Sequence, residues 1–127
     1  MVNNWPIKKL GEVADVVMGQ SPPSSSYNER GEGLPFFQGK AEFGVIYPTP
    51  VKYCSSPSRI AEANDVLMSV RAPVGNINLA KEKSCVGRGL GALRAKKNIL
   101  NQMFLFYFMK KNENNWSRLS TGSTFSA

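Results

Sequence analysis

Histidine is absent from this sequence of 127 residues, and cysteine occurs only twice. A chain without histidine lacks the commonest general base, the usual activator of a nucleophile and the most frequent zinc ligand. Cys54 and Cys85 form no C-x-x-C pair, so we interpret them as buried free thiols, in preference to a disulfide or a metal site. The sequence therefore predicts no catalytic residue, no metal and no cofactor, and an enzyme working through lysine or carboxylates is the least favoured class.

Long apolar segments are also lacking. The longest apolar run, Met103–Met109, is far shorter than the ~20 residues that cross a membrane. The chain does not open with a signal segment either, because Lys8 and Lys9 follow directly on the short segment Trp5–Ile7. Together with a length suited to one domain and a content of 42% hydrophobic and 20% charged residues, this predicts a cytoplasmic globular domain.

Acidic residues are scarce in the second half of the chain. Residues 66–127 contain ten Lys and Arg against two acids, a balance of +8, whereas residues 1–65 contain six against seven, a balance of −1. The sum is the net charge of +7, and the pI is near 9.7. A basic half of this kind is typical of a nucleic-acid-binding domain. A solvated basic face without a ligand is the alternative.

The stretch Asp65–Leu79 predicts a central hairpin. Apolar residues at alternate positions from Val66 to Val70 face one way, and the residues between them run from apolar to polar to charged. This is the pattern of a strand that leaves the core at one end. A turn with proline and glycine follows, after which the apolar pattern resumes. Arg71 stands at the end of the strand beside this turn, where it is either solvated or directed at an anion.

Other segments have the alternation and the flanking prolines and glycines of extended chain. They are 15–19, 34–39, 84–95 and the proline-broken segment 46–54, which predicts an edge strand at best. Single helical turns are expected at 10–14 and at 59–63, the latter opened by Pro57.

One full helix is predicted, over about 99–111, with Asn98 or Asn101 as its cap. Because 103–109 is apolar all round, we expect this helix to be buried on most sides. The predicted fold class is therefore mixed α/β (α+β): a twisted, largely antiparallel sheet with one buried helix and ligand-facing loops.

Two segments have features of binding loops. The loop Gln20–Asn28 is short, stiffened by two prolines and rich in serine, and it follows a predicted core strand, as recognition loops do. A plain surface linker is the alternative for it. In the segment 84–95, Gly87, Gly89 and Gly91 alternate, which weakens a strand unless a ligand or another backbone approaches closely. Their spacing fits neither the dinucleotide fingerprint nor a P-loop.

Five segments, in this order and spacing, resemble a target recognition domain from the specificity subunit of type I restriction-modification enzymes. They are Trp5–Val13, Gly19–Pro23, Leu34–Lys40, Asp65–Gly75 and Ser120–Phe125. The resemblance implies one domain, 1–127, of a longer subunit, cut before a spacer helix. It further implies double-stranded DNA as the ligand and non-catalytic reading of one half of a split target. Methylation (M) subunits and an endonuclease/translocase (R) subunit would bind mostly through parts of the subunit outside this fragment.

This resemblance turns the basic half and the polar loops into a candidate DNA-binding surface. We expect arginines to contact guanine or clamp phosphates, glutamines to read adenine, and the glycines to let backbone N–H groups approach the duplex. The candidate residues are Gln20, Ser21, Ser24, Tyr27, Gln38, Lys40, Arg71, Arg88, Arg94, Ser120, Thr121 and Ser123.

Two other classes of function fit the same residues. A module for single-stranded nucleic acid or RNA would stack bases on exposed Tyr27, Phe36, Phe37 and Tyr47, and would bind single strands more tightly than duplex. A protein-interaction domain would dock an acidic partner on its basic half, with DNA binding too weak to matter at physiological salt.

Overall fold

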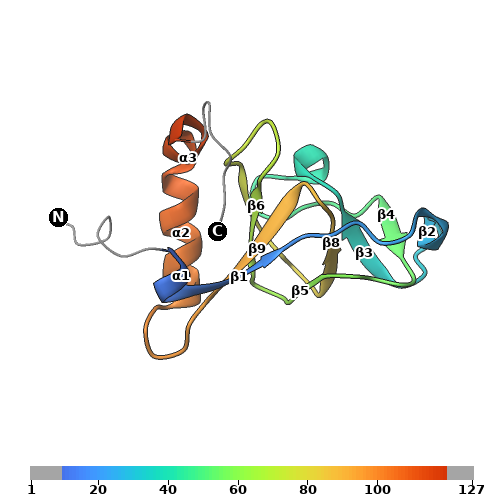
Figure 1. Cartoon of the computed structure of the whole chain (residues 1–127), viewed down its shortest axis with the longest axis horizontal. Coiled ribbons are helices and arrows are strands. Elements are labelled where there is room, and N and C mark those ends of the chain that lie inside the picture. Colours follow the sequence, from blue (N-terminus) through green and yellow to red (C-terminus); the bar gives the residue numbers. More distant parts are fainter. Residues whose placement is uncertain (1–9, 120–127) are drawn as a thin grey trace.

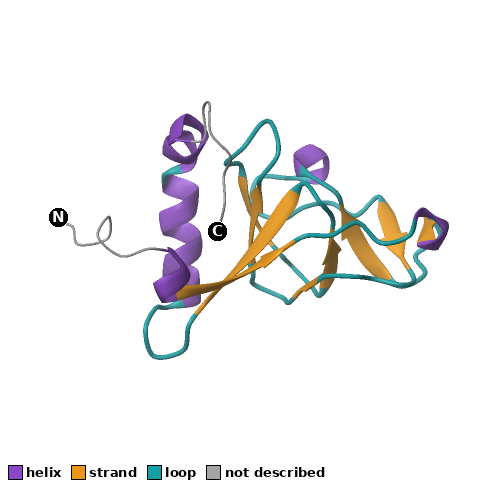
Figure 2. Ribbon diagram, viewed as in Figure 1, coloured by secondary structure: helices purple, strands orange, loops and turns teal. Residues whose placement is uncertain are grey.

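The structure, a computed structural model, describes residues 10–119. Two β-sheets pack together, and a pair of helices, α2 (Gln102–Lys111) and α3 (Glu113–Leu119), stands beside one of them (Figures 1 and 2). The single helical turn α1 (Leu10–Val13) leads into the first strand, as predicted. Within the described range, no helix has the length and apolar character needed to span a membrane.

The sheet next to α2 has four antiparallel strands in the order β1-β9-β6-β7. These strands are β1 (Ala14–Met18), β6 (Val66–Ser69), β7 (Ile77–Leu79) and β9 (Leu90–Ala95). β6 lies inside the sheet, where Val66 is opposite both Leu79 on β7 and Leu93 on β9. The predicted central strand and the hairpin that returns through Leu79 are both confirmed.

The second sheet has five short strands in the order β2-β4-β3-β8-β5. They are β2 (Tyr27–Asn28), β3 (Leu34–Phe37), β4 (Lys52–Cys54), β5 (Ile60–Ala61) and β8 (Ser84–Val86). All neighbours are antiparallel except β3 and β8, which run parallel. Two 3-10 turns, η2 (Ser24–Ser26) and η3 (Lys40–Glu42), lie in the loops. The predicted α+β class is confirmed, with the strands divided between two sheets.

Two segments differ from their predicted structure. The segment 46–54 is predicted as an edge strand, yet β4 lies inside its sheet, between β2 and β3. Its prolines precede the strand, so they remove no N–H group from the ladder. The predicted helical turn at 59–63 is wrong, because residues 60–61 form β5 and pair with β8. Pairing with a buried strand outweighs the weak helix-starting signal of Pro57.

β6 is buried on both faces, which explains its central place. Val66 and Met68 belong to a core cluster with the buried side of α2. Leu67 belongs to a second cluster that includes Phe37 and Val86 of the other sheet. The four-stranded sheet is therefore the middle one of three packed layers, and the chain leaves the core only beyond the end of β6.

α2 is less buried than the sequence predicts. Asn101 caps it, its side chain accepting a hydrogen bond from the backbone N–H of Phe104 at 3.0 Å. The stripe with Leu105 and Met109 packs on the sheet, whereas Phe104 and Tyr107 are 46% and 62% exposed. The cap is confirmed, and the expected burial on most sides is wrong, because the sheet covers only one stripe of the helix.

The two helices also bind the backbone groups of Ile77 at the open edge of β7. Glu113 accepts a hydrogen bond from the backbone N–H of Ile77 at 2.7 Å, and Lys110 donates to the carbonyl of Ile77 at 3.2 Å. The two side chains form an ion pair with each other, at 3.1 Å. Backbone groups satisfied in this way do not offer a site for pairing with another strand.

Both cysteines are free and buried, as predicted. Cys54 on β4 and Cys85 on β8 flank β3 and pack with Phe36. Burial raises the pKa of the Cys85 thiol to about 11, and the neighbouring Cys54 adds to the shift. Cys85 is therefore a neutral core side chain near pH 7.

Candidate nucleic-acid interface

The turn Gly87–Gly89, which we call the glycine turn, joins β8 to β9. Three other segments of the chain form backbone hydrogen bonds at or beside it. The first is the loop after β1. The N–H groups of Gly19 and Gln20 donate to the carbonyls of Leu90, at 2.8 Å, and Val86, at 3.1 Å. These two acceptors lie on either side of the glycine turn, so the loop after β1 is fixed against it.

The other two segments follow β3 and β6. The carbonyls of Phe37 and Gln38 accept hydrogen bonds from the N–H groups of Gly87, at 2.8 Å, and Gly89, at 2.9 Å. The N–H of Val70, at the end of β6, donates to the carbonyl of Gly89 at 2.9 Å. Three loops that are far apart in the sequence thus meet at one turn.

Glycine is required here by the close approach of the loops. A Cβ at Gly19 would overlap the carbonyl oxygen of Gly87, and one at Gly89 would lie 2.5 Å from the carbonyl oxygen of Gln38. The predicted close approach is confirmed, but the partner is the backbone of this chain. Because the amides of Gly87 and Gly89 are engaged in these contacts, they are not free to approach a duplex, contrary to the prediction.

Three of the predicted DNA-binding residues are joined by hydrogen bonds at the glycine turn. The hydroxyl of Ser21 donates to Oε1 of Gln38 at 3.0 Å and accepts from the backbone N–H of Arg88 at 3.4 Å. Oε1 of Gln38 also lies against Gly87, where an added Cβ would overlap it. The loops after β1 and β3 are thereby coupled through their side chains as well as through their backbones.

A fourth predicted residue, Gln20, brings in an arginine that the sequence did not point to. Nε of Arg59 donates to Oε1 of Gln20 at 3.3 Å, and the carbonyl of Arg59 accepts from the N–H of Val86 at 3.0 Å. Arg59 therefore belongs to this site. Its only sequence signal is its charge, and the pairing of β5 with β8, which brings it here, is the pairing that the sequence failed to predict.

Arg71, Arg88 and Lys40 extend from the same segments. Arg71 follows Val70, and Lys40 begins η3, two residues after Gln38. All three side chains are exposed, and among residues 10–119 none of them has a hydrogen-bond or ion-pair partner. Cationic groups in this situation are available to phosphates or to the acceptors of guanine.

Arg94 differs from the other predicted arginines. Its Nε and one terminal nitrogen bind the two carboxylate oxygens of Asp65, each at 2.8 Å. Asp65 is 2% exposed, and hydrogen bonding to it raises the pKa of Arg94. At the extended rise per residue, Arg94 lies ~17 Å along the chain from Gly89. It ties β9 to the start of β6 and is not part of the group at the glycine turn.

The remaining candidates lie elsewhere. Tyr27 is on β2, which β4 and β3 separate from β8. Its hydroxyl donates to the carbonyl of Pro22 at 3.1 Å, and its ring centroid lies 4.7 Å from that of Phe36. Ser24 is exposed on η2. Ser120, Thr121 and Ser123 lie outside the described residues.

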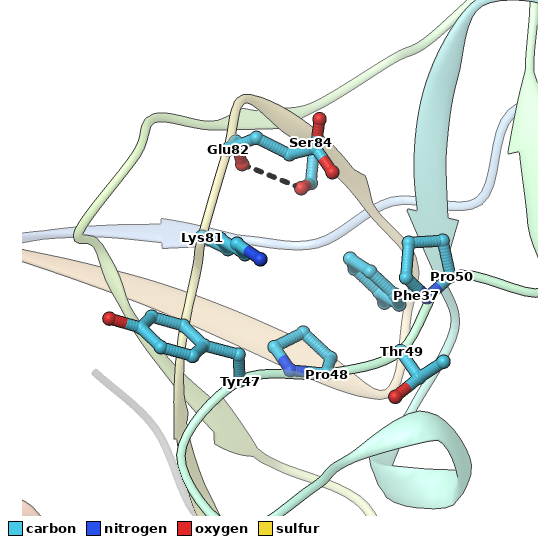
Figure 3. A pocket seen from close by; sticks show the side chains of 8 residues that line it. All are labelled: Phe37, Tyr47, Pro48, Thr49, Pro50, Lys81, Glu82 and Ser84. Carbon is cyan, nitrogen blue, oxygen red and sulfur yellow. Dashed lines mark hydrogen bonds between the residues drawn. The ribbon is translucent and has the colours of Figure 1, made fainter.

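The aromatic residues of the stacking alternative are not arranged as a platform. Phe36 and Phe37 are 3% and 2% exposed, and Tyr27 is half-buried, which leaves Tyr47, at 43%, as the exposed member of the four. Tyr47 lines a pocket of about 490 Å³, with Lys81 above its ring at 6.0 Å from the centroid (Figure 3). A single ring does not make the row of stacking surfaces that a single strand needs.

The loops of the two-sheet scaffold carry cationic and amide side chains, and one half of the chain is strongly basic. Both features are typical of a nucleic-acid-binding domain. Comparison with known families makes this specific. The family model described as "Type I restriction modification DNA specificity domain" matches residues 3–127, and the chain belongs to this family. The resemblance seen in the sequence is confirmed.

Individual proteins similar to this chain are also specificity subunits or parts of type I systems. A protein of Methanocaldococcus jannaschii assigned as the MjaX specificity subunit of a type I restriction enzyme is 46% identical over 126 residues, covering 98% of this chain and 30% of the relative. The crystal structure of the HsdS subunit from Thermoanaerobacter tengcongensis is 53% identical, with a TM-score of 0.81, and covers 87% of this chain and 28% of that one. A further structure, described as concerning complex assembly and conformational transition of the type I R-M system, is 51% identical, with a TM-score of 0.83, and covers 92% of this chain and 30% of that one. This chain thus spans less than a third of the length of these proteins.

Proposed function

We propose that this chain is a single target recognition domain, residues 1–127, of a longer specificity subunit, and that it reads one half of a bipartite target in double-stranded DNA. The observation that carries the proposal is the convergence of three loops on the glycine turn, which brings Gln20, Gln38, Arg71 and Arg88 together. Family membership and the share of each relative that the chain covers support a one-domain role.

Affinity in this proposal comes from phosphates, and sequence preference comes from base edges. Lys40 and Lys83 are exposed cations suited to phosphates. Arg71 and Arg88 are suited to guanine or phosphate, since their guanidinium groups have no partner within the described residues. Arg94, which Asp65 holds, takes a structural role. Ser24, Tyr27, Ser120, Thr121 and Ser123 stay predictions.

The domain itself carries no catalytic step in this proposal. In the full-length subunit, methylation (M) subunits and an endonuclease/translocase (R) subunit bind mostly through regions outside this chain, and the assembly works in the cytoplasm. The similar structure whose description concerns complex assembly of the type I R-M system supports this assignment of partners.

The direct test is selection of duplexes from a randomised library by the full-length subunit assembled with its methylation partner. We expect a defined half-site. That half-site should change when Arg88 is replaced by alanine, and the change then identifies the half that this domain reads. Recovery of sequences with no shared half-site would contradict the proposal.

A competition experiment separates the alternatives. The selected duplex should displace either of its single strands at physiological salt, because the buried Phe36 and Phe37 cannot stack on bases. Tighter binding to the single strands would favour the single-strand or RNA module. Binding that disappears entirely at physiological salt would favour a protein-interaction domain with a basic face.

A further inference from the structure

The hydrogen bonds at the glycine turn engage the amide oxygens of Gln20 and Gln38 and leave their amide nitrogens without a partner among the described residues. Oε1 of Gln38 accepts from the hydroxyl of Ser21 and lies against Gly87. Oε1 of Gln20 accepts from Nε of Arg59. In both glutamines the amide nitrogen is the group that has no partner among the described residues, and an amide nitrogen is only a donor.

Ser21 fixes the orientation of the Gln38 amide. Its oxygen accepts the backbone N–H of Arg88 at 3.4 Å, so its own proton is free to point to Gln38, at 3.0 Å. The result is a chain of donor to acceptor that runs from the Arg88 amide through the hydroxyl to Oε1. A hydroxyl engaged on both sides has little left to offer a ligand, and its effect is to hold the Gln38 carbonyl inward.

The cations around this amide are also donors only. Arg71, Arg88 and Lys40 are exposed, and a guanidinium or ammonium group has no acceptor. Within residues 10–119, no ion pair involves any of the three side chains. A ligand that binds these side chains must therefore present acceptors.

Base edges differ in this respect. In the major groove guanine presents two acceptors, N7 and O6, adenine presents one acceptor and one donor, and cytosine presents a donor. A glutamine that reads adenine must offer the base both its oxygen and its nitrogen. With its oxygen turned inward, Gln38 offers only the nitrogen.

We infer that the glycine turn reads guanine and not adenine, through donors on Gln38, Arg71 and Arg88, and that Ser21 sets this preference by holding the carbonyl of Gln38 inward. The inference rests on the proposed function and adds to it the chemical class of base that the site accepts. It also replaces the expectation, made from residue type alone, that the glutamines read adenine.

The first test needs no change to the protein. The full-length subunit, assembled with its methylation partner, is titrated with duplexes carrying the half-site recovered by selection. Replacing guanine in that half-site by 7-deazaguanine removes the N7 acceptor and keeps base pairing. We expect binding to weaken roughly 10- to 100-fold. The matched control, 7-deazaadenine in the same half-site, should change binding by less than about threefold.

The outcomes separate the two claims. A half-site without guanine, or one insensitive to 7-deazaguanine, overturns the inference and leaves the recognition role intact. Failure to recover any half-site overturns the proposed function itself.

The second test concerns Ser21. In Ser21→Ala the carbonyl of Gln38 is released, so the amide can offer both of its groups to adenine, and we expect the preference for guanine over adenine at one position to fall roughly tenfold. Ser56→Ala is the matched control, because Ser56 is an exposed serine outside the glycine turn. A base profile for Ser21→Ala that equals the profile of the control overturns the positioning role of Ser21.

Discussion

An arginine lies at each end of β9, and the two guanidinium groups differ in whether they have a partner. Arg88, just before the strand, is exposed, and its side chain has no partner among the described residues. Arg94, near the end of the strand, is bound by both carboxylate oxygens of Asp65, which is buried. A charge that is paired with a buried acid takes a structural role although its side chain is half exposed, whereas an unpaired charge on a loop remains available to a ligand.

This contrast shows what a count of charges leaves out. The balance of +8 in residues 66–127 includes Arg94 and Lys110, which form ion pairs with Asp65 and Glu113. The basic half therefore contains cations held in ion pairs as well as cations, such as Arg88, that have no partner among the described residues. Variants that remove one contact or one charge at a time test this division.

Gly89→Ala should have the largest effect, because the new Cβ would lie 2.5 Å from the carbonyl oxygen of Gln38. We expect the free energy of unfolding to fall by about 3 kcal/mol and duplex binding to be lost, since the loops cannot close on the turn. Urea unfolding and a DNA titration measure the two effects. Gly39→Ala is the control, as its Cβ would meet nothing within 4 Å. Equal stability of the two variants would contradict the close approach.

Asp65→Asn should separate stability from recognition. The substitution keeps the shape but leaves the guanidinium of Arg94 without its carboxylate, and because Arg94 is 47% exposed we expect a loss of about 1–2 kcal/mol. The preference among DNA sequences should not change. Glu32→Gln is the control, since its pair with Arg30 is exposed and should contribute little. A changed half-site in Asp65→Asn would place Arg94 in the recognition surface after all.

Arg88→Ala and Arg71→Ala should show the reverse behaviour. Neither guanidinium has a partner among residues 10–119, so stability should stay within about 0.5 kcal/mol of the parent. Duplex binding should weaken by about 1–3 kcal/mol, with relaxed specificity at one base position if the arginine reads a base. Unchanged affinity and specificity for either variant would make that arginine a solvated loop residue.

Lys40→Ala should have the smallest effect. Lys40 is exposed on η3, beside the loop that carries Gln38, and we expect a phosphate contact. Binding should then weaken equally for all sequences. The negative slope of log affinity against log salt should become less steep by roughly 0.9. Titrations at several salt concentrations give this slope. A specificity change without a change in slope would mean that Lys40 reads a base.

The fold was predictable where the pattern is local. The hairpin between Asp65 and Leu79 follows from alternation and a proline–glycine turn, and the cap of α2 follows from the position of Asn101. The segment 59–63 was mispredicted because its strand exists only through pairing with β8. The burial of α2 was overestimated because composition does not show how much of a helix a sheet can cover.

The candidate site was predictable in its residue types and not in its connections. Glycine spacing indicated a close approach, and charge indicated Arg71 and Arg88. No local pattern separates Arg94 from them, because the acid that binds it lies 29 positions away. Arg59 was missed because its neighbour Gln20 is reached only through the folding of the second sheet.

The central hairpin and the amounts of positive charge and glycine follow from the sequence alone, because they depend on neighbouring residues and on composition. The class of domain follows from the resemblance of five segments to a known family. Which cations are free, which glycines touch backbone and which group of the Gln38 amide stays unpaired depend on the tertiary structure, because hydrogen bonds and ion pairs form at distances of about 3 Å. Here those distances are set by strand pairing between segments far apart in the chain.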